Sequence, residues 1–118
     1  MSRAYQQIEG TRWPSGDCRS VAMLGLEPQE LQAHLSITFL RDIDDLDYHL
    51  YAWLRLASGR QVLLLRYEGN QYPGTEALVD VGDNPSTALR ELLDALELTD
   101  ATVTWTPEDV TLAREAVA

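Results

Sequence analysis

The chain has 118 residues, 45% of them hydrophobic and 24% charged, and its nineteen acidic against nine basic side chains give a formal net charge of −10. A chain of this length can form a core of its own, so we expect one folded domain over residues 1–118. The charge disfavours nucleic acid and acidic membranes, since no positive stripe is present to neutralise phosphates. It favours a basic partner protein, although solubility alone is the simpler explanation.

All nine basic residues are arginines, and the chain has no lysine. That excludes a Schiff base, a pyridoxal phosphate site and a Walker-type phosphate loop, because each of them needs an ammonium group. Cys18 is the single cysteine and forms no internal disulfide. There is neither a signal-peptide pattern nor an apolar run of membrane-spanning length. We therefore expect a cytoplasmic protein without a membrane segment or cofactor.

The first nineteen residues predict little regular structure, and a strand, a helix and a second strand are predicted after them. Residues 1–19 contain a turn-forming cluster around Trp13, and residues 20–24 form a short apolar run typical of a strand. Pro28 suits the first position of a helix, which we expect to run to about His34. Residues 35–41 are rich in β-branched and aromatic side chains and favour a strand, although one helical stripe would also fit them.

Residues 48–67 predict a β-hairpin, because two alternating apolar runs flank Ser58-Gly59. A reversal at this pair places Leu54 opposite Leu63 and Ala52 opposite Leu65 on a core face. A second turn at Asp44-Asp45 then places residues 35–41 beside the first strand. The second face of the sheet would carry Ser36, Thr38, Leu40, His49, Tyr51, Trp53, Arg55, Val62, Leu64 and Arg66.

The C-terminal half predicts a further strand and two helices. Ala77, Val79 and Val81 alternate as the inward residues of a strand over 77–81. A helix starts with Asn84 as its cap and Pro85 as its first residue, and its buried stripe consists of Leu89, Leu92, Leu93 and Leu96. Residues 102–105 form a short strand, and a last helix runs from Pro107 to about Ala116. The expected fold is α+β: an antiparallel four- to five-stranded meander sheet with a leucine-rich helix on one face and a short C-terminal helix.

The second face is the candidate contact surface. Tyrosine, tryptophan and arginine are the residue types that most often anchor protein interfaces. This face must be covered by the N-terminal segment or the last helix, by a second copy of the chain, or by a partner. Neighbouring acids would steer a basic partner, so the candidate binding residues are Asp42, Asp44, Asp45, Asp47, Tyr51, Trp53 and Arg55.

Two chemical alternatives use the same region. Asp45, Asp47 and His49 project from one face of an extended chain and could hold a divalent metal, as a metal-binding domain or enzyme would, although a solvated acidic turn explains them as well. Cys18 with His34 or His49 would suffice for nucleophilic catalysis, but no catalytic motif surrounds it. We therefore expect no catalytic residue and no enzyme.

The segment LVDVGDNPSTALRELLDAL, a strand followed by a proline-initiated helix, precedes the short strand TVTW ending in Trp105. This arrangement, which covers about the last third of a small acidic chain, resembles that of the immunity proteins that bacteria make against their own polymorphic toxins. The resemblance implies binding and blocking of a toxin domain, often a basic nuclease or a deaminase. Because such proteins share no catalytic motif, it assigns no functional residue. The expected function is a non-enzymatic, immunity or antitoxin-like inhibitor of a basic partner; a homodimer that buries its sheet faces mutually is a further possibility.

Overall fold

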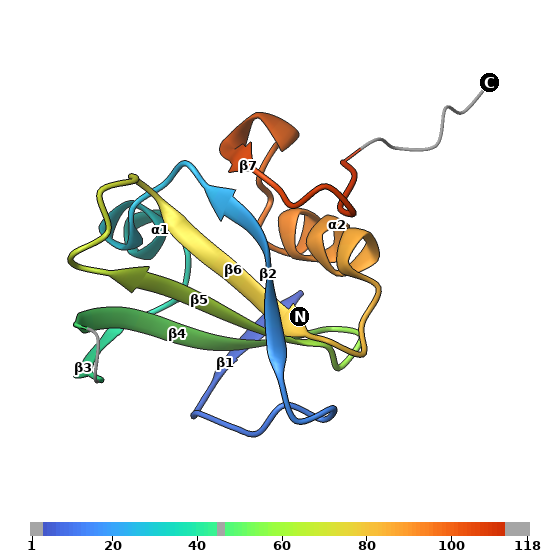
Figure 1. Cartoon of the computed structure of the whole chain (residues 1–118), viewed down its shortest axis with the longest axis horizontal. Helices are drawn as coiled ribbons and strands as arrows, with labels where there is room; N and C mark the ends of the chain where they lie inside the picture. The colour runs from blue at the N-terminus through green and yellow to red at the C-terminus, as the bar shows by residue number, and fades with distance from the viewer. Residues whose placement is uncertain (1–3, 45–46, 113–118) are drawn as a thin grey trace.

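The computed structural model describes residues 4–44 and 47–112. Within them it contains, in chain order (Figure 1), β1 (Tyr5–Ile8), β2 (Cys18–Leu24), α1 (Pro28–His34), β3 (Leu40–Ile43), β4 (Tyr48–Leu56), β5 (Gln61–Tyr67), β6 (Thr75–Asp80), α2 (Pro85–Ala95), the 3-10 turn η1 (Asp100–Thr102) and β7 (Val103–Trp105). None of the helices in these ranges has the length and apolarity that crossing a membrane requires.

The strands form one antiparallel sheet in the order β1-β4-β5-β6-β2-β7, with β3 also paired to β4. β3 pairs with residues 48–51 of β4 and β1 with residues 53–56, so the two short strands share one edge of β4. The α+β class and the antiparallel meander of β4, β5 and β6 agree with the sequence analysis. The expected four to five strands were too few, because the sheet has seven within the described residues.

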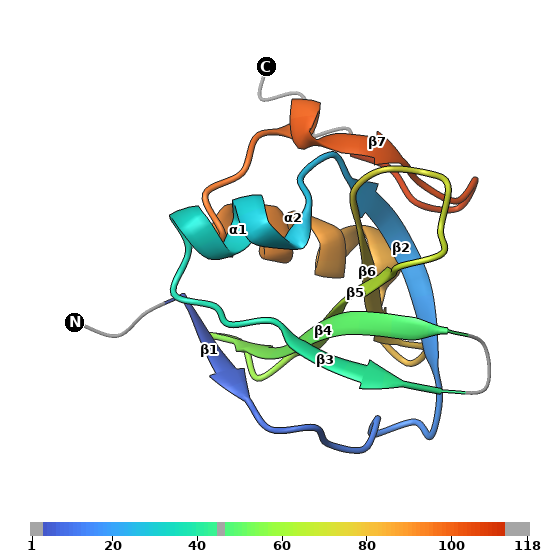
Figure 2. The same cartoon turned by 90° about the vertical axis from the view of Figure 1, so that its left-hand side faces the viewer.

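Both helices lie on the same side of the sheet, and the chain between β1 and β2 passes on the other side (Figure 2). α2 starts as expected: the Asn84 side chain accepts a hydrogen bond from the Thr87 N–H at 3.0 Å, and Pro85 is the first helical residue. The predicted stripe of α2 lies entirely in the core, with exposed fractions of at most 2%: Leu89, Leu92, Leu93 and Leu96.

The β4–β5 hairpin forms, but its register differs from the prediction by one residue. Leu54 pairs with Val62 and Ala52 with Leu64, and both of these partners on β5 are buried. The reason is the turn: the Gly59 N–H bonds to the Leu56 carbonyl and the Leu56 N–H to the Arg60 carbonyl. This closes a three-residue loop over 57–59, with Gly59 at φ +92°, in place of the expected two-residue reversal. Val62, Leu64 and Arg66 therefore belong to the core face, and Leu63 and Leu65 take their place on the second face.

The predicted strand over residues 35–41 is largely absent, because β3 begins only at Leu40. Side chains bind the backbone N–H groups that a sheet would otherwise use. The Ser36 N–H donates to the Tyr5 hydroxyl at 3.0 Å, and the Thr38 N–H to Gln7 Oε1 at 2.8 Å. This segment nevertheless contributes Ile37 to the core.

The expected C-terminal helix is not present in the described part of its range. Residues 106–112 contain a turn, closed by a bond from the Val110 N–H to the Pro107 carbonyl at 3.1 Å, and no helix. Asp109 forms a two-bond ion pair with Arg19 at 2.6 Å, and Val110 enters the core. Residues 113–116 of the predicted helix lie outside the described residues.

Leu89→Ala removes a fully buried side chain from α2, so we expect the free energy of unfolding to fall by about 2–5 kcal/mol through lost contacts and a cavity. Leu40→Ala is the matched control, because Leu40 is 51% exposed. Chemical denaturation followed by circular dichroism measures both. Equal losses for the two variants would contradict the assignment of α2 to the core.

Candidate functional site

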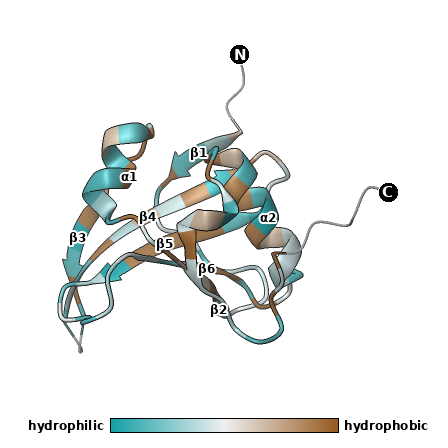
Figure 3. Cartoon of the chain, turned by 90° about the horizontal axis from the view of Figure 1, so that it is seen from above, coloured by the Kyte–Doolittle hydropathy of each residue, from teal (hydrophilic) through white to brown (hydrophobic). Residues whose placement is uncertain are grey.

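The sheet face opposite α1 and α2, called the open face below, carries a broad apolar surface. The pairing aligns one row of residues from β3 to β7, namely Leu40, Tyr51, Leu65, Glu76, Met23 and Trp105. The adjacent row consists of Ile8, Trp53, Leu63, Leu78 and Ser20. None of these side chains is fully buried, and Leu40 and Trp105 are about half exposed. Figure 3 shows the concentration of hydrophobic residues along the central strands.

A groove of about 330 Å³ crosses this face at β4 and β5. Its lining consists of Gly10, Asp42, His49, Tyr51, Trp53, Leu63 and Leu65. At one end Trp13 packs on Trp53, with ring centroids 4.8 Å apart, and a Cβ added to Gly10 would lie 3.4 Å from the indole nitrogen of Trp53. The N-terminal segment thus covers the Trp53 end of the groove, and Trp53 remains half-buried.

The other end of the groove is acidic. Asp42 on β3 lies opposite His49 on β4. Asp44 Oδ2 accepts a hydrogen bond from the Tyr67 hydroxyl at 2.6 Å and lies 3.7 Å from His49 Nδ1. This hydrogen bond to a carboxylate, with burial and the charge of Asp44, raises the pKa of Tyr67 to about 12. The groove therefore joins aromatic rings to negative charge.

The structure separates the remaining predicted binding residues. Asp47 precedes β4, where its carboxylate accepts a hydrogen bond from the Tyr48 N–H, and Asp45 lies outside the described residues. Arg55 is exposed at the far end of β4, about 20 Å from His49 along an extended strand. Thus Asp42, Tyr51 and Trp53 line one groove, and Asp44 lies next to it beside His49. Arg55 does not reach the groove.

Several residues of the open face were not predicted. Leu63 and Leu65 were assigned to the core because the hairpin register was placed one residue off. Glu76 joins the face because β6 begins at Thr75, before the predicted strand, and pairs with β5. Met23 and Trp105 join it only because β2 pairs with both β6 and β7. Period-two alternation shows which residues of a strand share a side, but it does not show which distant strands are neighbours.

The two chemical alternatives find little geometric support among the described residues. These residues contain no group of three or more histidine, cysteine or acidic side chains that could hold a metal ion. The predicted set depends on Asp45, so it stays a prediction. Cys18 on β2 is separated from His49 by β5 and β6, about 14 Å across the sheet, and His34 ends α1 on the other side of the sheet. Burial raises the pKa of Cys18, and the charges of Asp17 and Glu76 raise it further, so the thiolate is disfavoured.

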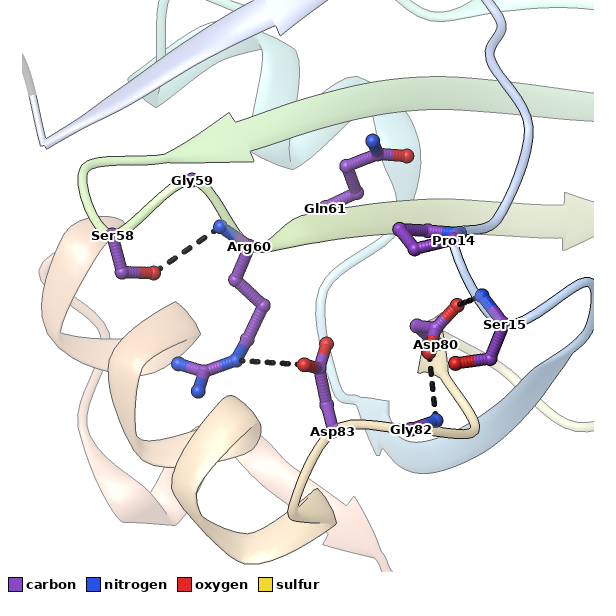
Figure 4. Close-up of a pocket in the computed structure, with 9 residues that line it drawn as sticks. All are labelled: Pro14, Ser15, Ser58, Gly59, Arg60, Gln61, Asp80, Gly82 and Asp83. Atoms are coloured by element: carbon purple, nitrogen blue, oxygen red, sulfur yellow. Dashed lines mark hydrogen bonds and ion pairs between the residues drawn. The ribbon is translucent and has the colours of Figure 1, made fainter.

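A second hollow of about 380 Å³ lies at the hairpin end of the sheet and has a structural role (Figure 4). Asp80, 5% exposed, accepts hydrogen bonds from the Ser15 N–H at 2.8 Å and the Gly82 N–H at 2.7 Å. Arg60 forms ion pairs with Asp83 and Glu91. These bonds fasten the N-terminal loop to the end of β6 and the hairpin to α2.

No known protein family, curated protein or solved structure matches the chain. The resemblance to immunity proteins therefore stays a prediction, and the open face must be interpreted from its own residues.

We expect the Asp80 carboxylate to stabilise the fold in a pH-dependent way. Hydrogen bonds from the Ser15 N–H and hydroxyl, and then from Gly82, lower its pKa below the ordinary value of 3.8. The folded state then binds fewer protons than the unfolded state, so the stabilisation is present above pH 3.8 and is lost as the pH falls through the lower pKa of the folded state. Asp80→Asn should therefore destabilise the protein most above this value, and the difference from wild type should shrink in more acidic buffer. Thermal unfolding across this range measures it; a constant difference would contradict the role of the carboxylate.

Proposed function

We propose that this chain is a non-enzymatic interaction protein that binds a basic partner protein through the open face. The observation that carries the proposal is the row of partly exposed apolar and aromatic side chains across the sheet, with a groove at its centre. Contiguous apolar surface of this kind marks interaction sites in proteins that are otherwise well packed. Tyr51 and Trp53 are the aromatic anchors at the groove.

The charge of the chain supports a basic partner. The net charge is −10. Asp42 lines the groove, and Asp44 lies next to it beside His49. Several arginines already pair with other carboxylates away from the groove, among them Arg19 with Asp109 and Arg60 with Glu91. Their charge is compensated within the chain, so the acids at the groove attract a cationic surface and accelerate encounter at low salt. Asp45 and Asp47 would add to this steering.

The resemblance to immunity proteins suggests what kind of partner this is. A toxin domain with a basic active-site surface would meet the acids of the groove, and its activity would be blocked when the open face covered that surface. A second copy of the chain would instead bring another set of acids to the same place, so self-association through this face is electrostatically less favourable.

Trp53→Ala should weaken the complex with the basic partner by at least about 2 kcal/mol, which corresponds to roughly 30-fold in the dissociation constant. Affinity purification from the native cell would supply the partner, and calorimetry with the purified pair would measure the change. Val81→Ala is the control, because Val81 is 45% exposed and lies outside the open face. The Trp53 indole also packs on Trp13, so circular dichroism must show that the variant is folded. A folded Trp53→Ala variant with unchanged affinity would contradict the proposal.

Raising the salt concentration from low to moderate should release the partner, because screening weakens recognition between exposed charges. Asp42→Asn should reduce this salt dependence.

Sedimentation of the purified chain is expected to show a monomer. A dimer that Trp53→Ala dissociates would replace the basic partner by a second copy of the chain.

A further inference from the structure

Glu76 stands near the middle of the open face, and no described arginine forms an ion pair with it. It belongs to β6, and its cross-strand neighbours are Leu65 on β5 and Met23 on β2, both partly buried. The alternation of β6 places Glu76 on the same side as Leu78, whereas Ala77 and Val79 point into the core. Within residues 4–44 and 47–112, no hydrogen bond or ion pair involves its carboxylate.

Five of the seven described arginines bind other groups, and no ion pair joins Arg12 or Arg55 to Glu76. Arg19 binds Asp109, Arg41 binds Glu68, Arg60 binds Glu91, Arg66 lies 3.5 Å from Glu27, and Arg90 binds Asp100. Arg55 stands at the hairpin end of β4, away from the row that contains Glu76. A carboxylate without an ion pair between the apolar neighbours Leu65 and Met23 is therefore a specific feature of this surface.

Leu65 and Met23 flank this partly buried carboxylate on the sheet. No arginine in the described part of the chain forms an ion pair with it. Its field also reaches other groups of the chain: it contributes, after stronger causes, to the raised pKa values of Cys18 and Tyr67. A carboxylate that lies between apolar neighbours without an internal ion pair is available to a cation of a partner.

We propose that the basic partner places an arginine side chain on Glu76, between Leu65 and Met23. This inference rests on the proposed function and specifies the chemistry by which the open face recognises its partner. A guanidinium ion fits the surroundings better than an ammonium ion, because it is weakly hydrated, lies flat on apolar side chains and binds both oxygens of a carboxylate. A partner that supplied it would satisfy a charge that the chain itself leaves without compensation.

The test uses N-acetyl-arginine amide as the probe and the full chain labelled with nitrogen-15. We expect the probe to shift the backbone amide signals around Leu65, Glu76 and Met23, and to do so less as salt is added. N-acetyl-citrulline amide has a similar shape without the charge and should produce at least a five-fold smaller shift. In the Glu76→Gln variant, the amide shifts caused by the arginine probe should also be at least five-fold smaller than in wild type.

Glu108→Gln is the matched variant, because it removes the same charge from an exposed turn after β7. It should leave the response at Leu65 and Met23 unchanged. The melting temperature of Glu76→Gln should equal or exceed that of wild type, which separates a binding role from a structural one. Equal responses in wild type and Glu76→Gln, equal responses to the two probes, or a lower melting temperature would each overturn the inference. The proposed function is tested separately by the affinity of Trp53→Ala for the partner. Failure of the arginine-binding inference can therefore be distinguished from failure of the proposed function.

Discussion

The loop that joins β4 to β5 is the constraint on which the rest of the structure depends. Two backbone bonds, Gly59 to Leu56 and Leu56 to Arg60, close it over residues 57–59. Gly59 has φ +92°, a conformation that other residues rarely adopt. The loop length sets the pairing register of the hairpin. Because side chains alternate between the two sides of a strand, the register decides which side chains of β5 face the core. It decides that Val62 and Leu64 enter the core while Leu63 and Leu65 line the groove.

The open face is covered at one end and accessible at the other. The hydrogen bond from the Ser15 N–H to Asp80 holds the N-terminal loop against the sheet, and the Gly82 N–H binds the other oxygen of the same carboxylate. The N-terminal loop also places Trp13 on Trp53. Further along the sheet, Leu40 and Trp105 remain about half exposed. Intramolecular cover, one of the possibilities raised by the sequence, is thus partial. What it leaves is a groove with an aromatic end and an acidic end, suited to a partner that supplies both apolar contact and positive charge.

The distribution of ion pairs decides which acids of the chain keep their negative charge uncompensated among the described residues. Its arginines bind acids that fasten one segment to another, such as Arg19 to the turn at Asp109 and Arg90 to Asp100. Glu76 and Asp42 take no part in these ion pairs among the described residues. Internal pairing therefore leaves negative charge on the same face that carries exposed apolar surface. A cationic partner that covered this face would compensate both the charge and the apolar exposure.

Local patterns in the sequence determined the helices α1 and α2, the hairpin, the central meander and the leucines that fill the core, because capping residues and periodicity act over a few positions. They did not determine the hairpin register, since Ser58-Gly59 is compatible with loops of two lengths. Nor did they predict β1 or the late start of β3. Before β3, the side chains of Tyr5 and Gln7 accept the backbone hydrogen bonds that a neighbouring strand would otherwise accept. Only the tertiary structure placed Met23 beside Glu76 and Trp105 beside Met23, because the order of strands in a sheet depends on contacts between distant segments. The candidate binding face was therefore visible in the sequence as a set of residue types, and its composition was decided by the pairing of β2 with β6 and β7.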